Sequence, residues 1–204
     1  MDRGLSPFVE PFLALGIPLD INVVVPECEQ LPVEEARAGS PEAWDILFRR
    51  YQLPLYVYAV ELVHDEQASL DIVQETFISA VRHIRGLRDD GKFGSWLFGI
   101  AHQKCIQRWR ARKREEAWRE EIAVTPLAFD ESPLDVVIRQ EQEAEFMMLL
   151  NKLPPPQRSV LLLHFLEDFS LEEIADITAA QLGTVKSRIH YAKRALRKLL
   201  EENV

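Results

Sequence analysis

The sequence predicts an all-α fold: two small helical domains joined by a flexible, acidic linker. Apolar residues recur at steps of three and four along most of the chain after residue 32, which is the period of helices that bury one face. The pattern fails within residues 115–145, where ten acidic residues stand against two basic ones around two prolines. A chain of 204 residues is long enough for two such domains.

Domain boundaries are expected where these signals change. Residues 1–31 form an N-terminal extension, 32–117 the first domain, 118–133 the linker and 134–204 the second domain. The extension is apolar but holds four prolines, so it cannot be a membrane-spanning helix, and its start makes a poor signal peptide. Two cysteines are too few for a disulfide framework. We therefore expect a cytoplasmic protein without direct membrane insertion.

The first domain is expected to hold four helices. Ser40 and Pro41 form an N-cap and a first-turn proline, and Pro54 should end that helix and start another. A third helix should run from about residue 66 to 84, and Ser95 should cap a long fourth one. The side chains expected inside are Trp44, Leu47, Phe48, Tyr51, Leu55, Tyr58, Ala59, Leu62, Ile72, Phe77, Ala80, Val81, Ile84, Trp96, Leu97, Ile100, Ala101 and Trp109.

The second domain should also be helical. The three prolines at 154–156 should end one helix and precede an apolar one over residues 159–166. Ser170 and Glu173 have the spacing of a capping box, so a short helix should follow directly. We expect Thr184 to cap the last helix. One apolar stripe follows that helix: Leu182, Val185, Ile189, Ala192, Leu196 and Leu199.

Charge is distributed unevenly along the chain, whose formal net charge is −9. Residues 103–114 hold six basic and no acidic residues, and so do residues 184–198. The other twelve basic residues stand against all 33 acidic ones. Two basic segments on an acidic body indicate two separate contacts with nucleic acid, and they leave the remaining surface available for proteins.

The arrangement of residues 170–200 is that of a helix-turn-helix, in which a short helix and a turn precede a longer cationic helix. The second helix of this motif enters the major groove of DNA, and its cationic side chains neutralise phosphates. The alternative is a solvated amphipathic helix, but a solvated surface normally mixes both signs of charge. We therefore favour DNA binding.

Three motifs, in this order, resemble the sigma-70 family of RNA polymerase initiation factors, in its extracytoplasmic-function (ECF) type. The motifs are DIVQETFISAVRHI at 71–84, FGSWLFGIAHQKCIQRW at 93–109, and a third that runs from LPPPQRSVLLLHF at 153–165 to GTVKSRIHYAKRAL at 183–196. The resemblance covers about residues 32–200. It implies two helical domains on a flexible linker, with core RNA polymerase and promoter DNA as partners and an anti-sigma factor as a further partner.

The resemblance also implies which residues meet the polymerase. Asp71, Gln74, Glu75 and Phe77 match family residues that dock on the clamp helices of the polymerase's largest subunit. Without the resemblance, three polar residues at this spacing indicate a solvated acidic helix face.

Two further groups of residues are implied for promoter DNA. Residues near the minus-ten element would be His102, Gln103, Lys104, Arg108, Trp109, Arg110 and Arg112. Residues near the minus-thirty-five element would be Lys186, Ser187, Arg188, His190, Lys193 and Arg194. Trp109 could stack on an unpaired base, whereas Trp96 is expected in the core. The pair His102-Gln103 stands where the family commonly has Arg-Asn, and Gly99 where Arg is frequent.

No catalytic or metal site is expected. His102 and Cys105 have the spacing of half a zinc site, but no second pair of ligands accompanies them. The sequence holds no Gly-rich phosphate loop, nucleophile motif or clustered carboxylate pair. We therefore expect no enzyme activity, no cofactor, no metal and no small-molecule substrate.

The predicted function is an alternative sigma factor that recruits core polymerase and recognises two promoter elements. A stand-alone helix-turn-helix regulator is the first alternative, but it leaves the acidic helix and the first basic segment without a role. An interaction protein whose acidic body is its working surface is the second alternative. Steep salt dependence of DNA binding would separate that protein from the other two.

Overall fold

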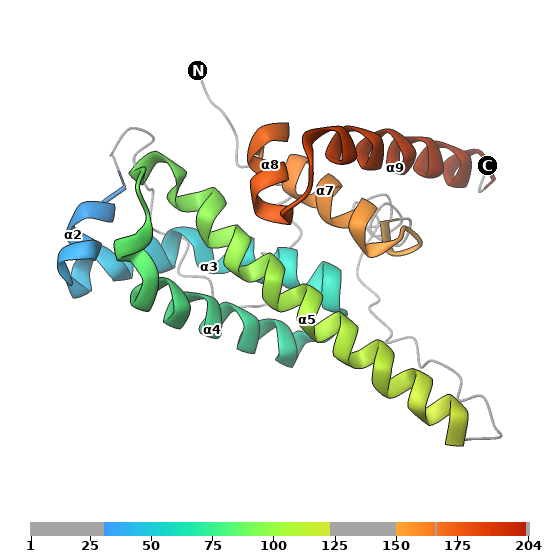
Figure 1. Ribbon diagram of the computed structural model, residues 1–204, viewed down its shortest axis with the longest axis horizontal. Coiled ribbons are helices and arrows are strands. Elements are labelled where there is room, and N and C mark those ends of the chain that lie inside the picture. Colours follow the sequence, from blue (N-terminus) through green and yellow to red (C-terminus); the bar gives the residue numbers. More distant parts are fainter. Residues whose placement is uncertain (1–30, 123–149, 166, 203–204) are drawn as a thin grey trace, which may run out of the picture.

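The computed structural model describes residues 31–122, 150–165 and 167–202, and no strand occurs among them (Figure 1). The helices are α2 (Val33–Ala38), α3 (Pro41–Val63), α4 (Glu66–His83), α5 (Phe93–Ile122), α7 (Pro155–Phe165), α8 (Leu171–Thr178) and α9 (Leu182–Glu202). Two 3-10 turns, η1 (Ile84–Gly86) and η2 (Asp90–Lys92), lie between α4 and α5. The expected all-α fold class is confirmed.

The predicted extension and linker lie mostly outside the described residues. Only Leu31 of the extension is described, and residues 118–122 of the predicted linker continue α5. The described helices include none that is both long enough and apolar enough to cross a membrane.

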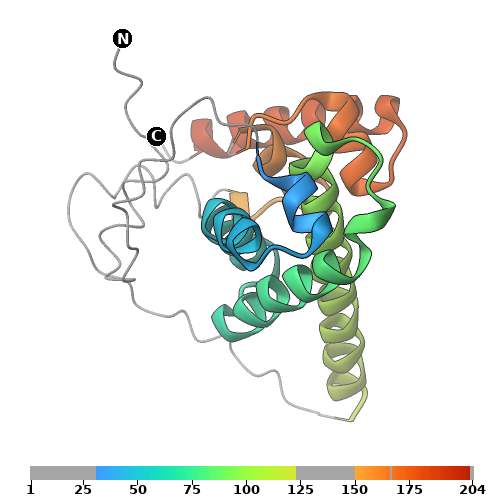
Figure 2. The same cartoon turned by 90° about the vertical axis from the view of Figure 1, so that its left-hand side faces the viewer.

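Helices α3, α4 and α5 form the first domain around a common core. Their facing sides bury Leu47, Tyr58 and Phe98 almost completely. Helix α2 packs beside α3, where the indole Nε1 of Trp44 donates a hydrogen bond to the carbonyl of Ala36 at 3.0 Å. The C-terminal part of α5 projects beyond this core in both views (Figures 1 and 2).

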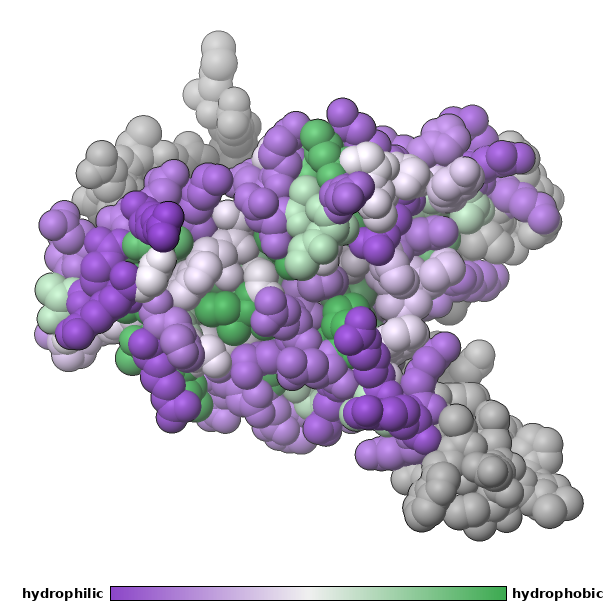
Figure 3. All heavy atoms as spheres, viewed as in Figure 1, coloured by the Kyte–Doolittle hydropathy of each residue, from purple (hydrophilic) through white to green (hydrophobic). Residues whose placement is uncertain are grey.

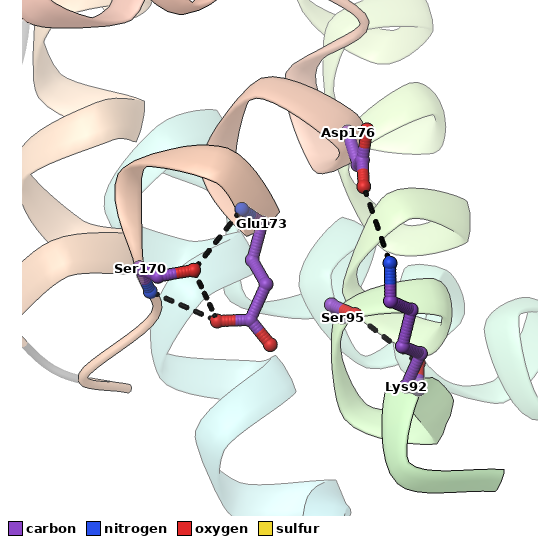
Figure 4. A network of polar contacts seen from close by, with 5 residues as sticks. All are labelled: Lys92, Ser95, Ser170, Glu173 and Asp176. Carbon is purple, nitrogen blue, oxygen red and sulfur yellow. Dashed lines mark hydrogen bonds and ion pairs between the residues drawn. The ribbon is translucent and has the colours of Figure 1, made fainter. Parts of the chain in front are cut away.

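Helices α7, α8 and α9 form the second domain. The predicted capping box is confirmed, since the Glu173 amide donates to Ser170 Oγ at 3.2 Å and the Ser170 amide donates to the Glu173 carboxylate at 2.9 Å (Figure 4). Behind it, four residues of the predicted apolar stripe of α9 are buried against α7 and α8: Val185, Ile189, Ala192 and Leu196. Leu182 is half-buried, and the side chain of Leu199 lies outside the described part of the structure. The helix-turn-helix is therefore a packed unit.

Pro54 lies inside α3, and the expected break into two helices is wrong. A proline within a helix removes one backbone hydrogen bond and costs about 3 kcal/mol. Tyr51, Leu55 and Tyr58 are all buried along the same side of α3, before and after the proline. Their packing against the core outweighs the local cost and keeps the helix continuous.

Two residues expected in the core are exposed. Val81 is 53% exposed, because at about 100° per residue it lies about 140° around α4 from the buried Thr76. Phe48 is 39% exposed, with its ring against that of Phe77 at a centroid distance of 4.9 Å.

Two helices begin earlier than expected. Helix α5 begins at Phe93, directly after η2, and the hydroxyl of Ser95 donates to the Lys92 carbonyl instead of capping the helix. Helix α7 begins at Pro155, because proline has the backbone angle of a helix and the first turn needs no amide donor from it.

The turn between α8 and α9 is made without glycine or proline. Ala179 ends α8 in the left-handed conformation, with a φ of 49°. Helix α9 then begins at Leu182, and the amides of Thr184 and Val185 both donate to the carbonyl of Gln181. Thr184 therefore lies within the first turn, and its expected role as the cap is wrong.

The two domains pack directly against each other. Helices α7, α8 and α9 lie along one side of the first domain (Figures 1 and 2), where α8 contacts α5 and α7 contacts α3. The ring of Phe98 on α5 meets that of Phe169, just before α8, at a centroid distance of 5.2 Å. The sequence did not predict this contact.

The left-handed Ala179 leads to a stability prediction. Ala179→Gly should stabilise the protein by about 0.5–1 kcal/mol. In the left-handed conformation the Cβ of an alanine is crowded by the backbone, and glycine has no Cβ. The control Glu172→Gly, at an exposed position in the first turn of α8, should destabilise it by up to about 1 kcal/mol. Urea unfolding measures both changes, and equal destabilisation by the two variants would contradict the assignment of Ala179.

Candidate nucleic-acid and protein interfaces

The exposed face of α4 combines acidic and apolar side chains. Asp65 caps the helix, so its register places Asp71, Gln74 and Glu75 toward solvent. Apolar side chains stand among them and are also exposed: Leu70 at 53%, Ile78 at 48% and Val81 at 53%. Solvated helix faces are normally polar, so exposed apolar side chains at this density indicate a surface that binds another protein.

Phe77 does not belong to this exposed face. It is 7% exposed, and its side chain packs into the core beside Phe48. Of the four residues predicted for protein docking, the structure therefore brings Asp71, Gln74 and Glu75 together at the surface and places Phe77 beneath them.

The projecting end of α5 carries the first basic segment. Arg108, Arg110, Lys113 and Arg114 are exposed there, and Figure 3 shows hydrophilic side chains over this part of the molecule. Trp109 is partly exposed, with the Lys113 ammonium 4.9 Å from its ring centroid. The arrangement combines a cationic surface for phosphates with one aromatic face at its side.

Two basic residues of this segment are engaged within the protein. The Lys104 ammonium pairs with the Glu75 carboxylate at 2.9 Å, and thus joins the first basic segment to the exposed face of α4. The Arg112 guanidinium donates to the carbonyl of Val63, at the C-terminal end of α3, at 3.4 Å.

His102 is buried rather than presented at the surface. It is 8% exposed, and its Nδ1 lies 2.7 Å from the hydroxyl of Tyr58, which is itself fully buried. Burial, with a smaller contribution from the nearby Arg188, lowers the pKa of His102 to about 4, so the imidazole is neutral at pH 7. The next residue, Gln103, is exposed and available for contacts.

The half zinc site suggested by the spacing of His102 and Cys105 gains no further ligands from the described residues. Cys105 is 1% exposed, and burial raises the pKa of its thiol to about 12. In residues 31–122, 150–165 and 167–202, no three His, Cys, Asp or Glu residues cluster where they could hold a metal ion.

The second basic segment forms the outer face of α9. The buried stripe fixes the rotation of this helix, and five predicted residues then share the exposed side: Lys186, Ser187, His190, Lys193 and Arg194. Arg188 points elsewhere, since it is half-buried and close enough to His102 to influence that pKa. The structure therefore brings together five of the six residues predicted for this site.

A polar cluster around one buried arginine lies between the domains and was missed from the sequence. Arg158 of α7 is 4% exposed, and its guanidinium donates to His64 Nε2 at the end of α3 and to Asn151 Oδ1 at 2.8 Å. Partial desolvation, with Arg158 and Arg112 nearby, lowers the pKa of His64 to about 4. A guanidinium can only donate, so the His64 ring nitrogen accepts this bond. The sequence signal for this cluster was an arginine directly before the apolar run of α7.

Glu61 completes this cluster. Its Oε2 is buried and has no hydrogen-bond partner among the described residues. Burial raises the pKa of Glu61 to about 7, although the charge of Arg158 acts in the opposite direction. The carboxyl group is therefore close to half protonated at neutral pH.

Comparison with known proteins assigns both domains. The sigma-70 region 2 family matches residues 47–115, and the sigma-70 region 4 family matches residues 143–196. The RNA polymerase sigma-H factor of Pseudomonas aeruginosa is 33% identical over 183 residues, which cover 86% of this chain and 95% of that protein. The chain belongs to the sigma-70 family.

Within this family, relatives of the ECF type confirm the resemblance that the motifs indicated. The ECF sigma factor SigW of Bacillus subtilis is 30% identical to this sigma factor over 178 residues, which cover 83% of this chain and 95% of SigW. A solved sigma factor from Bartonella quintana, RpoE in complex with the anti-sigma factor NepR, is 25% identical with a TM-score of 0.59 and covers 77% of this chain and 98% of that one.

A further solved structure supports the fold alone. CnrH, in complex with the cytosolic domain of CnrY, has a TM-score of 0.63 at 24% identity and covers 86% of this sigma factor and 98% of its own chain.

Glu61 makes the stability of the protein depend on pH. A carboxyl group whose pKa is higher when folded than when unfolded is tolerated while neutral, and it destabilises the fold increasingly as pH rises from about 4.5 to about 7. Glu61→Gln should remove this loss, which amounts to about 3 kcal/mol at most. Urea unfolding at pH 5 and pH 8 measures it.

The difference between wild type and Glu61→Gln is the informative quantity, because other groups titrate in the same range. Burial also raises the pKa of Glu167 to about 7, whereas the lowered values of His64 and His102 act with the opposite sign below pH 6.5. A variant whose stability changes with pH as the wild type does would show that Glu61 is ionised without cost.

Proposed function

We propose that this sigma factor recruits core RNA polymerase through the exposed face of α4, and directs it to promoters through α5 and α9. Helix α5 contacts the minus-ten element, and α9 contacts the minus-thirty-five element. The protein is an initiation factor without catalysis of its own, and it acts in the cytoplasm, where polymerase and DNA are present. An anti-sigma factor is a further partner, in line with the relative that was solved bound to NepR.

The exposed face of α4 carries this proposal. Asp71, Gln74 and Glu75 supply hydrogen-bond acceptors and negative charge, while Leu70 and Ile78 supply apolar area beside them. Such a mixture suits a specific protein interface, in which apolar contacts provide affinity and polar contacts fix the orientation. Phe77 holds this face in place from the core side of α4.

The two basic surfaces support the division of promoter contacts. The projecting end of α5 offers Arg108 and Arg110 to phosphates and Trp109 as an aromatic face for a base, while Gln103 lies nearer the core. Lys104 and Arg112 would have to leave their present partners to reach DNA. His102 acts from beneath, where it fixes the register of α5 against Tyr58.

The alternative function, a stand-alone helix-turn-helix regulator, leaves the first domain without a role. It requires only α8 and α9 with their supporting helix. It leaves an exposed face with three apolar side chains on α4 and a second basic surface on α5 without partners. Membership of the sigma-70 family, with matches to both regions, argues against it.

Reversing the charge on α4 tests the polymerase contact. Asp71→Lys combined with Glu75→Lys should abolish binding to core polymerase, because it turns two acceptors into cations on the docking face. Both positions are exposed, so each change should alter the free energy of unfolding by about 0.5 kcal/mol or less, apart from the loss of the Lys104 pair. Pull-down with purified core polymerase measures the binding.

A matched control carries the same change of net charge on another element. Glu34 and Glu35 are exposed on α2, so Glu34→Lys with Glu35→Lys should bind core polymerase like the wild type. Unchanged binding by the α4 variant, or equal loss by both variants, would contradict the docking face on α4.

Base reading and phosphate contact should separate along α9. Lys186 lies in the second turn of the helix, close to the end that enters a major groove, and Arg194 lies two turns further on. Lys186→Ala should relax preference at particular minus-thirty-five positions, at a cost of about 1–3 kcal/mol if its contact is to a guanine. Arg194→Ala should weaken all sequences about equally and lower the salt slope by about one.

Selection of bound sequences from a randomised minus-thirty-five element, with the holoenzyme at two salt concentrations, measures both effects. A motif that is unaltered for Lys186→Ala, or altered for Arg194→Ala, would place the opposite end of α9 in the groove.

A further inference from the structure

An exposed aromatic side chain ends α7 next to the helix that we assign to the minus-thirty-five element. Phe165 is the last residue of α7 and is 48% exposed, whereas Leu161, Leu162 and Leu163 before it are buried. A single exposed apolar side chain is common on protein surfaces and indicates nothing by itself. The neighbours of Phe165 give it significance, because α7 packs against α9 (Figure 1).

The ring of Phe165 lies against the ammonium group of Lys193 on α9. Lys193 Nζ is 5.4 Å from the centroid of the ring. A cation within about 6 Å of an aromatic centroid is attracted to the negative face of the ring. The two residues belong to different helices, so the packing of α7 on α9 sets this contact.

Further contacts restrict the positions open to the Phe165 ring. The ring of His164 meets it edge-on at a centroid distance of 5.0 Å. His164 is half-buried, and its Nδ1 lies 3.4 Å from the carbonyl oxygen of Phe169. The aromatic surface offered to Lys193 therefore belongs to a supported end of α7.

The sequence of α9 offers Lys193 no carboxylate partner at helical spacing. Ion pairs along a helix form between residues three or four positions apart. At these distances from Lys193 stand Ile189, His190, Leu196 and Arg197. None of them is acidic, so the contact that orients this lysine comes from α7.

Lys193 lies at the margin of the outer face of α9. At about 100° per residue it is about 40° around the helix from the buried Ile189. When a helix enters the major groove, side chains at its margin lie nearest the phosphates that border the groove, whereas its outermost side chains reach base edges. An ammonium has three donors, so one that rests on a ring can still donate to a phosphate oxygen.

We propose that Phe165 is a positioning residue for promoter binding, whose ring holds the Lys193 ammonium toward a phosphate that borders the minus-thirty-five element. A free lysine side chain loses rotamer freedom when it binds a phosphate, and a lysine that is already oriented loses less. The inference rests on the proposed function, because it takes α9 as the minus-thirty-five contact. It extends that contact from α9 to the end of α7.

Two substitutions of Phe165 test the role of the aromatic face. Phe165→Leu keeps an apolar side chain but removes the ring, and Phe165→Tyr keeps the ring. Holoenzyme with Phe165→Leu should bind promoter DNA about two- to fivefold more weakly, whereas Phe165→Tyr should bind like the wild type. Fluorescence anisotropy of a labelled promoter fragment, selected with wild-type holoenzyme, measures the affinities.

A double-mutant cycle with Lys193→Gln separates positioning from packing. Lys193→Gln alone should weaken binding and lower the salt slope by about one. In that background Phe165→Leu should have no further effect, because the ring then has no cation to orient. Neither substitution should change the sequences selected from a randomised minus-thirty-five element, since phosphate contacts carry no base information.

Other outcomes would overturn the proposal. Equal losses from Phe165→Leu with and without Lys193→Gln would show that Phe165 acts through the packing of α7 on α9. Unchanged or tighter binding by Phe165→Leu would show that the ring does not direct Lys193 to DNA. Wild-type holoenzyme that binds promoter fragments no better than core polymerase alone would instead count against the proposed function, so failures of the two proposals are distinguishable.

Discussion

The approach of α8 to α5 at Gly99 is the constraint on which the arrangement of the two domains depends. It brings α8, the first helix of the helix-turn-helix, onto α5 of the first domain. Arg188, which shares α9 with the outward-facing DNA candidates, is half-buried and lies close enough to His102 of the first domain to lower its pKa. The described parts of the two domains therefore form one packed body.

The three exposed faces differ in chemistry in a way that suits their separate partners. The face of α4 is acidic with apolar side chains, whereas the end of α5 and the outer side of α9 are cationic. The chain as a whole is acidic, so association with DNA depends on where the positive charge is gathered rather than on the net charge of −9. The Lys104–Glu75 pair shows that these surfaces also touch within the protein.

Sequence patterns predicted the elements well where local chemistry decides them. The capping box at Ser170 follows from a short spacing and is confirmed, and so is the burial of Val185, Ile189, Ala192 and Leu196 in the predicted stripe of α9. Pro54 was misjudged because its cost is local, whereas the packing of α3 that outweighs it is tertiary. Phe48 and Val81 were placed inside because apolar character does not by itself say which side of a helix meets the core.

The sequence predicted which residues make up the candidate interfaces, but it predicted less well which of their side chains are exposed. Periodicity placed Asp71 and Glu75 outside, and the structure agrees, because a helix that buries one side must expose the other. His102, Lys104 and Arg188 turned out to be engaged inside the protein, through contacts between elements far apart in the sequence. The buried Arg158 and its partner His64 belong to the same class of long-range contact.

Run-off transcription with purified core polymerase on genomic fragments tests the central claim most directly. The account predicts discrete transcripts from a small set of fragments only when this chain is added, and none from core polymerase alone. Specific DNA binding by the chain without any polymerase-dependent transcript would contradict it, and would favour a stand-alone regulator.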